Sequence, residues 1–227
     1  MDDTLYSASA GMFHDIHVLM DAYIVERLGL TSEQANELRK YYWRKYGVTY
    51  YGLWLHHGID PHDFLTATHK VDTSSTQGRM REAIMSLKGQ RILFTNAPNS
   101  FVDQVLERLN LSSCFVDQYR AEDMKVFGHW RPKPSAKMLK NVLACHHVKP
   151  HECCLVDDNL NNLKVAKTVG IQTVLCKGWH HHGLEVIRPI PYVDAFISHI
   201  RDIKKILVSP TPKKQKHRRP IFLNPYN

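Results

Sequence analysis

Apolar residues recur at helical spacing through the first third of the chain, about residues 8–80. Five of them, four positions apart, mark one face of a first predicted helix: Met12, Ile16, Met20, Ile24 and Leu28. Gly29 is a typical helix stop, and Thr31 with Gln34 fits a capping box for a second helix. Pro61 opens another helix. No strand-like alternation interrupts this stretch, so we predict helix throughout.

After residue 88 short apolar runs alternate with helical segments. Three runs end in polar loops, as buried parallel strands do: Arg91–Thr95, Cys153–Asp157 and Gln172–Cys176. Helical spacing lies between and after them, at Phe101 to Leu109, at Leu139 to Leu143, and at Leu163 to Ala166 with Gly170 at the end. This alternation predicts an α/β fold with a doubly wound parallel sheet.

Composition describes an ordinary globular protein. The chain has 227 residues, 43% hydrophobic and 23% charged. No apolar run approaches 18 residues, and the N-terminus lacks the pattern of a secretory signal, so we expect no membrane span or leader. The five cysteines form no CxxC pair. A reducing, cytoplasmic location fits this pattern best.

The basic excess is concentrated at the end of the chain. The net charge is +8, and residues 209–227 contain five Lys or Arg and no acid, so the remainder is near +3. We expect a flexible tail there. Nucleic acid is expected to bind only through this tail, if at all, and the protein to be a monomer or a weak dimer.

Polar residues occur at four places where strands of the predicted sheet begin or end. They are Asp2–Thr4, Thr95–Asn96, Arg131–Pro134 and Asp157–Asn159. Ligands of parallel sheets bind at the carboxyl ends of strands, so these residues should converge. Clustered carboxylates need a cation, and oxygen ligands suit Mg²⁺ with a substrate phosphate. Lysine and threonine can donate to the phosphate oxygens.

The four segments, in order, resemble the four motifs of the haloacid dehalogenase (HAD) superfamily. They read Asp-Asp-Thr-Leu-Tyr, Leu-Phe-Thr-Asn-Ala, Arg-Pro-Lys-Pro and Leu-Val-Asp-Asp-Asn. The forms of the second and fourth motifs, with the Tyr41-to-Gly58 stretch, are most similar to the pyrimidine 5′-nucleotidase-like group. The resemblance implies a HAD-like Rossmannoid core at 1–8 and 82–208, an inserted helical cap at 9–81, and a tail at 209–227.

The resemblance also implies the role of each motif residue. Asp2 aligns with the second aspartate of the first motif, the general acid/base, and its main-chain carbonyl would bind Mg²⁺. Thr95 and Asn96 would hold phosphate oxygens, and Lys133 would neutralise the nucleophile and the phosphate. Asp157 and Asp158 would bind Mg²⁺ directly or through water.

The nucleophilic aspartate of the motif would stand one position before Met1. The motif also requires a central strand before it, so the first core strand is truncated in this sequence. We therefore expect about ten more in-frame codons upstream, encoding an apolar run that ends in Asp. Without this strand its two neighbours in the sheet would have unpaired backbone groups, and each buried unpaired group costs ~1–3 kcal/mol of stability. An alternative register makes Asp2 the nucleophile, but it puts Tyr6 where the motif has Thr.

Two further features have both a structural and a functional interpretation. The run His180–His182 could bind a metal or be a solvated loop. Seven aromatic residues of the cap could form its core or a base-stacking platform: Tyr41, Tyr42, Trp43, Tyr46, Tyr50, Tyr51 and Trp54.

The predicted function is Mg²⁺-dependent hydrolysis of a phosphomonoester, a nucleoside 5′-monophosphate, through an aspartyl-phosphate. Three alternatives remain. One is a HAD phosphatase for another small phosphate ester. Another is a dehalogenase, against which Asp2 argues because a halide needs no acid. The third is an inactive HAD scaffold that binds a partner or RNA.

Overall fold

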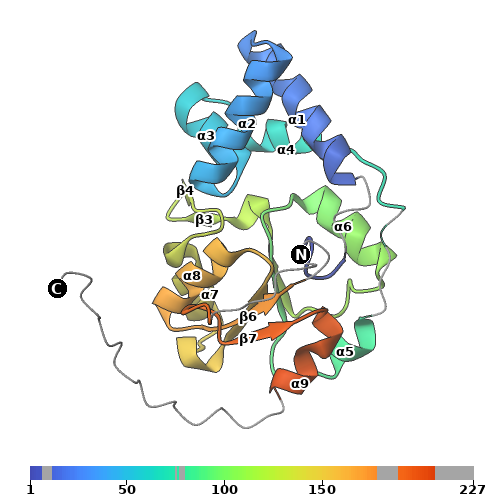
Figure 1. Ribbon diagram of the computed structural model, residues 1–227, viewed down its shortest axis with the longest axis vertical. Coiled ribbons are helices and arrows are strands. Elements are labelled where there is room, and N and C mark those ends of the chain that lie inside the picture. The colour runs from blue at the N-terminus through green and yellow to red at the C-terminus, as the bar shows by residue number, and fades with distance from the viewer. Residues whose placement is uncertain (7–11, 75, 77–79, 178–188, 208–227) are drawn as a thin grey trace, which may run out of the picture.

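The computed structural model describes residues 1–6, 12–74, 76, 80–177 and 189–207. A unit of four helices stands on an α/β layer (Figure 1). The helices of this unit, here called the helical cap, are α1 (Met12–Leu28), α2 (Ser32–Tyr46), α3 (Thr49–His57) and α4 (Pro61–Thr68).

Local signals set the ends of the cap helices as predicted. Gly29 adopts a left-handed conformation directly after α1. Thr31 caps α2, with Gln34 completing the capping box. Asp60 caps α4, which has Pro61 at its first position. The prediction of helix up to residue 80 is wrong: residues 69–74 carry none, and the chain leaves the cap there.

The α/β layer follows in chain order. Its helices are α5 (Arg81–Met85), α6 (Asn99–Arg108), α7 (Ala136–Cys145), α8 (Leu160–Val169) and α9 (Ile203–Leu207). Its strands are β1 (Ile92–Phe94), β2 (Asp117–Tyr119), β3 (Lys125–Val126), β4 (His129–Trp130), β5 (Cys154–Asp157), β6 (Gln172–Cys176) and β7 (Ala195–Ile197). Three single-turn 3₁₀ helices connect them: η1 (Ala121–Asp123), η2 (Pro150–Glu152) and η3 (Ile200–Asp202).

Parallel pairing confirms the predicted α/β class. β1 pairs with β2, and β6 lies between β5 and β7, all parallel. β3 and β4 form a small antiparallel hairpin. Strands β2, β3, β4 and β7 were not predicted. Among the described residues no ladder joins β1 to β5, so the parallel strands form two separate sheets.

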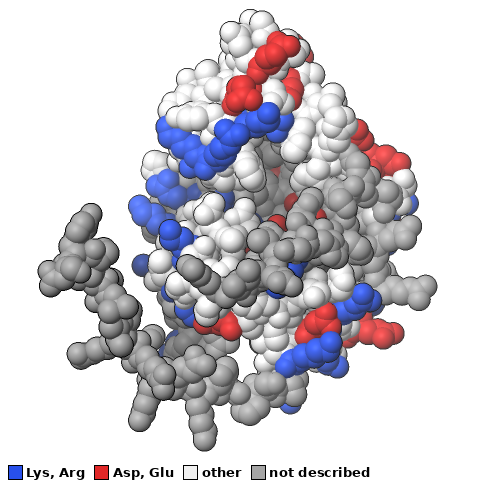
Figure 2. Space-filling model, in the orientation of Figure 1, with Lys and Arg blue, Asp and Glu red and all other residues white. Residues whose placement is uncertain are grey.

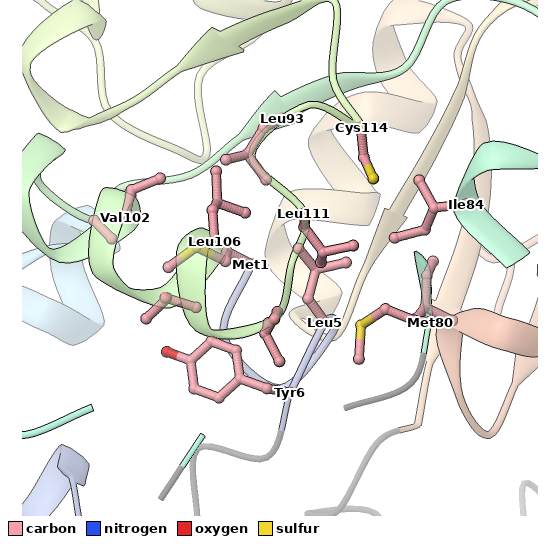
Figure 3. Packing of buried hydrophobic residues seen from close by; sticks show 14 of the residues in the cluster. Met1, Leu5, Tyr6, Met80, Ile84, Leu93, Val102, Leu106, Leu111 and Cys114 are labelled. Carbon is pink, nitrogen blue, oxygen red and sulfur yellow. The ribbon is translucent and has the colours of Figure 1, made fainter. Parts of the chain in front are cut away.

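The N-terminal residues lie inside the main core. Met1, Leu5 and Tyr6 pack in one cluster with side chains of α6 and the loop after it, including Leu106 and Leu111 (Figure 3). A second cluster fills the cap, and a third lies among α7, α8 and neighbouring strands. This packing holds the segment that begins the chain beside the strand ends that carry the predicted site.

Within the described part of the chain, no helix combines the length and the apolar character needed to cross a membrane.

Candidate active site

The carboxyl ends of β1 and β5 bring the predicted residues to one place. Thr95 directly follows β1, and Asp157 is the last residue of β5. Lys133 lies on the loop before α7, and Asp2 near the start of the chain. All of these residues line one cleft of about 1470 Å³ between the α/β layer and the cap. We call them, with Asn96 and Asp158, the floor of the cleft.

A buried ion pair lies at the centre of the floor. Lys133 Nζ is 2.9 Å from Asp157 Oδ2, and both side chains are under 10% exposed. Burial by itself lowers the pKa of Lys133, but the negative charge of Asp157 outweighs it and holds that pKa above its usual value. Burial likewise raises the pKa of Asp157, and the Lys133 ammonium brings it below its usual value. Both groups are therefore charged at neutral pH.

Both oxygens of Asp157 have partners. Its Oδ1 accepts hydrogen bonds from the backbone N–H of Asn159 and from Asn162 Nδ2, both at 2.9 Å. Asp157 therefore contributes a fixed negative charge that orients Lys133. Its Mg²⁺-binding role, expected from the resemblance, stays a prediction, and Oδ2, which accepts from Lys133 alone among the described residues, is the oxygen that could still bind the ion.

Asp158 is the more available carboxylate. Its Oδ1 accepts the Thr4 hydroxyl at 3.0 Å, and no ion pair holds its carboxylate among the described residues. Burial and the charge of neighbouring Asp157 raise the pKa of Asp158. A nearby cation would relieve this repulsion.

Asp2 is held by an aromatic hydroxyl. Tyr6 OH donates a short hydrogen bond to Asp2 Oδ1. Burial and the charge of Asp2 raise the pKa of Tyr6, which therefore stays a neutral donor. Sequence reasoning gave Tyr6 no positioning role; its place four residues after Asp2 is the only signal that could have indicated one.

Asn96 joins two parts of the floor. Its Nδ2 donates to the Lys133 carbonyl at 3.0 Å, and its Oδ1 accepts the Lys133 N–H at 2.9 Å. Thr95, only 1% exposed, accepts the N–H of Ala97 at 3.2 Å. The Asn96 amide thus positions the Lys133 loop, and its contact with a phosphate stays a prediction.

The donor set fits Mg²⁺. The floor supplies oxygen donors only, from Asp2 and Asp158, and Asp158 carries an electrostatic penalty that a cation relieves. No cluster of three or more metal-binding His, Cys, Asp or Glu side chains occurs among the described residues. Mg²⁺ does not need one, because it commonly takes one or two carboxylates, water and substrate phosphate.

The cap closes over the floor through a close approach at Gly47. This glycine ends α2 with φ of 80°. A Cβ built on it would lie 2.6 Å from the Lys133 carbonyl oxygen and 2.7 Å from Pro134 Cδ. Only glycine accommodates both the left-handed backbone and this contact. The last turn of α2 is therefore seated beside the Lys133 loop.

Four of the seven cap aromatics line the cleft: Trp43, Tyr46, Tyr50 and Tyr51. Tyr42 is buried in the cap core. Trp43 is 56% exposed, and Tyr50 is 3% exposed with a hydroxyl that finds no hydrogen-bond partner among the described residues. The run His180–His182 and the tail at 209–227 lie outside the described residues.

Sequence comparisons identify relatives over part of the chain. It is 32% identical over 91 residues to a phosphoglycolate phosphatase of Vibrio parahaemolyticus, covering 40% of this chain and 38% of that protein. It is 28% identical over 118 residues to a phosphoglycolate phosphatase of Vibrio vulnificus, covering 52% of this chain and 49% of that protein. The chain thus spans half or less of the length of these curated relatives.

Solved structures share the fold. A HAD phosphatase from Thermococcus onnurineus superposes with a TM-score of 0.57 at 17% identity, over 93% of this chain and 97% of that one. CbbY from Rhodobacter sphaeroides, in complex with phosphate, superposes with a TM-score of 0.59 at 15% identity, over 89% of this chain and 93% of that one. A family model of haloacid dehalogenase-like hydrolases matches residues 1–170. With most of its length matched, the chain belongs to the haloacid dehalogenase-like hydrolase family.

Proposed function

We propose that this protein hydrolyses phosphomonoesters. The observation that carries the proposal is the convergence of Asp2, Thr95, Lys133 and Asp158 on one cleft floor beneath the cap. A buried ammonium, a hydroxyl and two carboxylates are the groups that bind a phosphate and move a proton. The relatives named phosphoglycolate phosphatases support the same reaction class.

Each group of the floor has a proposed task. Lys133, fixed by Asp157 and by the Asn96 amide, attracts the phosphate into the cleft and offsets its charge. Asp2, oriented by Tyr6, gives a proton to the leaving alkoxide and then takes one from the attacking water. Bound Mg²⁺ would supply charge neutralisation of the phosphate, held by Asp2 and Asp158.

The covalent step through an aspartyl-phosphate needs a nucleophile that the resemblance places one position before Met1. The edges of β1 and β5 that no described strand pairs support the expectation of a strand there. We therefore propose that the active protein carries an apolar strand ending in Asp ahead of Met1.

The proposed substrate is a nucleoside 5′-monophosphate, with pyrimidines favoured. The exposed Trp43 and the other aromatic residues of the cleft wall support it, because a base can stack on such side chains. Phosphoglycolate is the competing substrate, since it appears in the names of the relatives.

The test is phosphate release with Mg²⁺ from UMP, CMP, phosphoglycolate and sugar phosphates. It is run on the given chain and on one extended by the codons that precede Met1 in its gene. We expect activity in the extended form, loss of it in Asp2→Asn, and none in the given chain. Phosphoglycolate exceeding UMP and CMP tenfold in kcat/KM would contradict the nucleotide substrate. No release from any ester by the extended form would contradict the phosphatase and favour the scaffold.

A further inference from the structure

The residues that line the cleft include a group of apolar side chains besides the charged ones. Figure 2 shows the hollow, with acidic atoms inside it and a band of basic residues along the edge of the cap. The apolar side chains come from α1, α4 and α6 and are here called the apolar wall: Ile16, Met20, Phe64, Leu65 and Phe101. His69, which directly follows α4 and also lines the cleft, contacts this wall.

Contacts on two sides fix the ring of His69. Its Nδ1 lies 3.0 Å from Thr68 Oγ1 and 3.2 Å from the Leu65 carbonyl oxygen. The ring also packs edge-on against Phe101 of α6, with the two centroids 5.8 Å apart. Since α6 begins three residues after Asn96, this contact holds His69 between the last helix of the cap and a helix that starts beside the floor.

The hydrogen bonds decide which nitrogen of His69 carries the proton. The Thr68 hydroxyl donates to the Phe64 carbonyl at 2.8 Å, and the Leu65 carbonyl can only accept. Nδ1 is therefore the N–H donor, and Nε2 of the neutral ring is an acceptor. Burial lowers the pKa of His69 to about 4, against the smaller opposing effects of the Leu65 carbonyl and the Asp2 charge, so the ring is neutral at pH 7.

Nε2 of His69 is available to a ligand. No hydrogen bond to it occurs among the described residues, whose two buried side-chain polar atoms without a partner are Tyr50 OH and Thr76 Oγ1. Nε2 is therefore not fully buried, and the cleft is the space that the half-buried His69 lines. An acceptor among apolar side chains favours a ligand that donates a hydrogen bond to it and disfavours one that leaves it unpaired.

We propose that His69 is a specificity-determining residue, whose Nε2 accepts a hydrogen bond from a hydroxyl of the leaving group. The proposal rests on the proposed phosphatase function and names its substrate class, phosphomonoesters of neutral alcohols that carry a further hydroxyl. A nucleoside 5′-monophosphate belongs to this class through the hydroxyls of its ribose. The phosphoryl group occupies the floor, and the sugar bonded to it faces the apolar wall.

The test compares ligands that cannot be hydrolysed. The methylenephosphonate analogues of UMP, 2′-deoxy-UMP and 3′-deoxy-UMP carry the same charge and differ by one hydroxyl. Calorimetry with Mg²⁺ measures the affinity of each for the given chain and for the extended one. We expect the loss of one of the two hydroxyls to weaken binding about tenfold, because His69 Nε2 then loses its donor. Equal affinities for all three analogues in both forms, or no binding of any, would overturn the proposal.

Two substitutions separate the acceptor from the structural role of the ring. His69→Asn keeps a donor near the place of Nδ1 and lacks Nε2, so the tenfold preference should disappear. His69→Gln brings an amide oxygen near the place of Nε2, so part of the preference should return. His62→Asn, at an exposed histidine of α4 that does not line the cleft, should leave the preference intact.

A preference that survives in His69→Asn, or one that His69→Gln does not restore at all, would overturn the role of Nε2. Failure of the phosphatase is a separate result. It would be seen as absence of phosphate release from every ester while the hydroxyl preference in binding persists, and that outcome would support the acceptor and contradict the reaction.

Discussion

The buried pair of Lys133 and Asp157 makes the stability of this protein depend on the Lys133 ammonium. Lys133→Met keeps the length of the side chain and removes its charge, leaving Asp157 buried with the two donors from Asn159 and Asn162 and the weaker influence of the Met1 ammonium. Loss of one partner of a buried pair costs about 3–5 kcal/mol. For a domain of this size that corresponds to a fall in Tm of roughly 6–20 °C.

The loss of stability in Lys133→Met should depend on pH. In the native protein the pKa of Asp157 lies below its usual value, so its contribution to the free energy of unfolding is present above about pH 3.9 and is lost as the pH falls through the folded pKa. Loss of Lys133 removes the largest influence that opposes burial, so we expect the pKa of Asp157 to rise and its charged form to be penalised at pH 7. Protonation removes the penalty, and the gap between native protein and variant should narrow from pH 7 to pH 4.5.

Urea unfolding at both pH values measures the gap, and Lys140→Met is the matched control because Lys140 is exposed on α7 and has no partner among the described residues. We expect the control to stay within about 0.5 kcal/mol of the native protein. The double variant Lys133→Met with Asp157→Asn should recover part of the loss, since no buried charge remains. A gap below about 1 kcal/mol at pH 7, or one that does not change with pH, would refute the reasoning.

Three further predictions address the cap, the metal and a buried hydroxyl. In the extended chain, Gly47→Ala should lower phosphate release at least tenfold because its Cβ collides with the Lys133 loop. Gly58→Ala, with the same left-handed backbone but open space, should cost only about 1–2 kcal/mol of stability; equal activities of the two variants would contradict the close approach. Millimolar Mg²⁺ should raise the Tm of the extended chain, and Asp158→Asn should abolish the rise. An unchanged Tm in the presence of Mg²⁺ would contradict a magnesium site on the floor of the cleft. Tyr50→Phe removes a buried hydroxyl that has no partner in the described part of the chain, so the free energy of unfolding should stay constant or rise by about 1–2 kcal/mol; a loss of that size would show that the hydroxyl is hydrogen-bonded.

Local signals in the sequence were sufficient to predict most of the long helices and three of the strands. Helical spacing placed α1, and the capping box at Thr31 and the proline at 61 placed the starts of α2 and α4, because these effects act within one or two turns. The apolar runs identified β1, β5 and β6 for a similar reason. β2 was not predicted because its three residues, Asp117–Tyr119, contain no apolar run. They form a strand because they pair with β1.

The polar residues that follow the strands were also evident from the sequence, since parallel strands present their carboxyl ends at one edge. Their partners were not. Asn96 binds the backbone of Lys133, 37 positions away, and Lys133 pairs with Asp157, 24 positions away, so the charge expected to require a metal already has an ammonium beside it. Which cap residues face the cleft was equally undetermined, because spacing gives a helix a face but not the neighbour toward which it turns. Only the packing of α2 against the Lys133 loop at Gly47 brought Arg44 and Trp43 to the cleft.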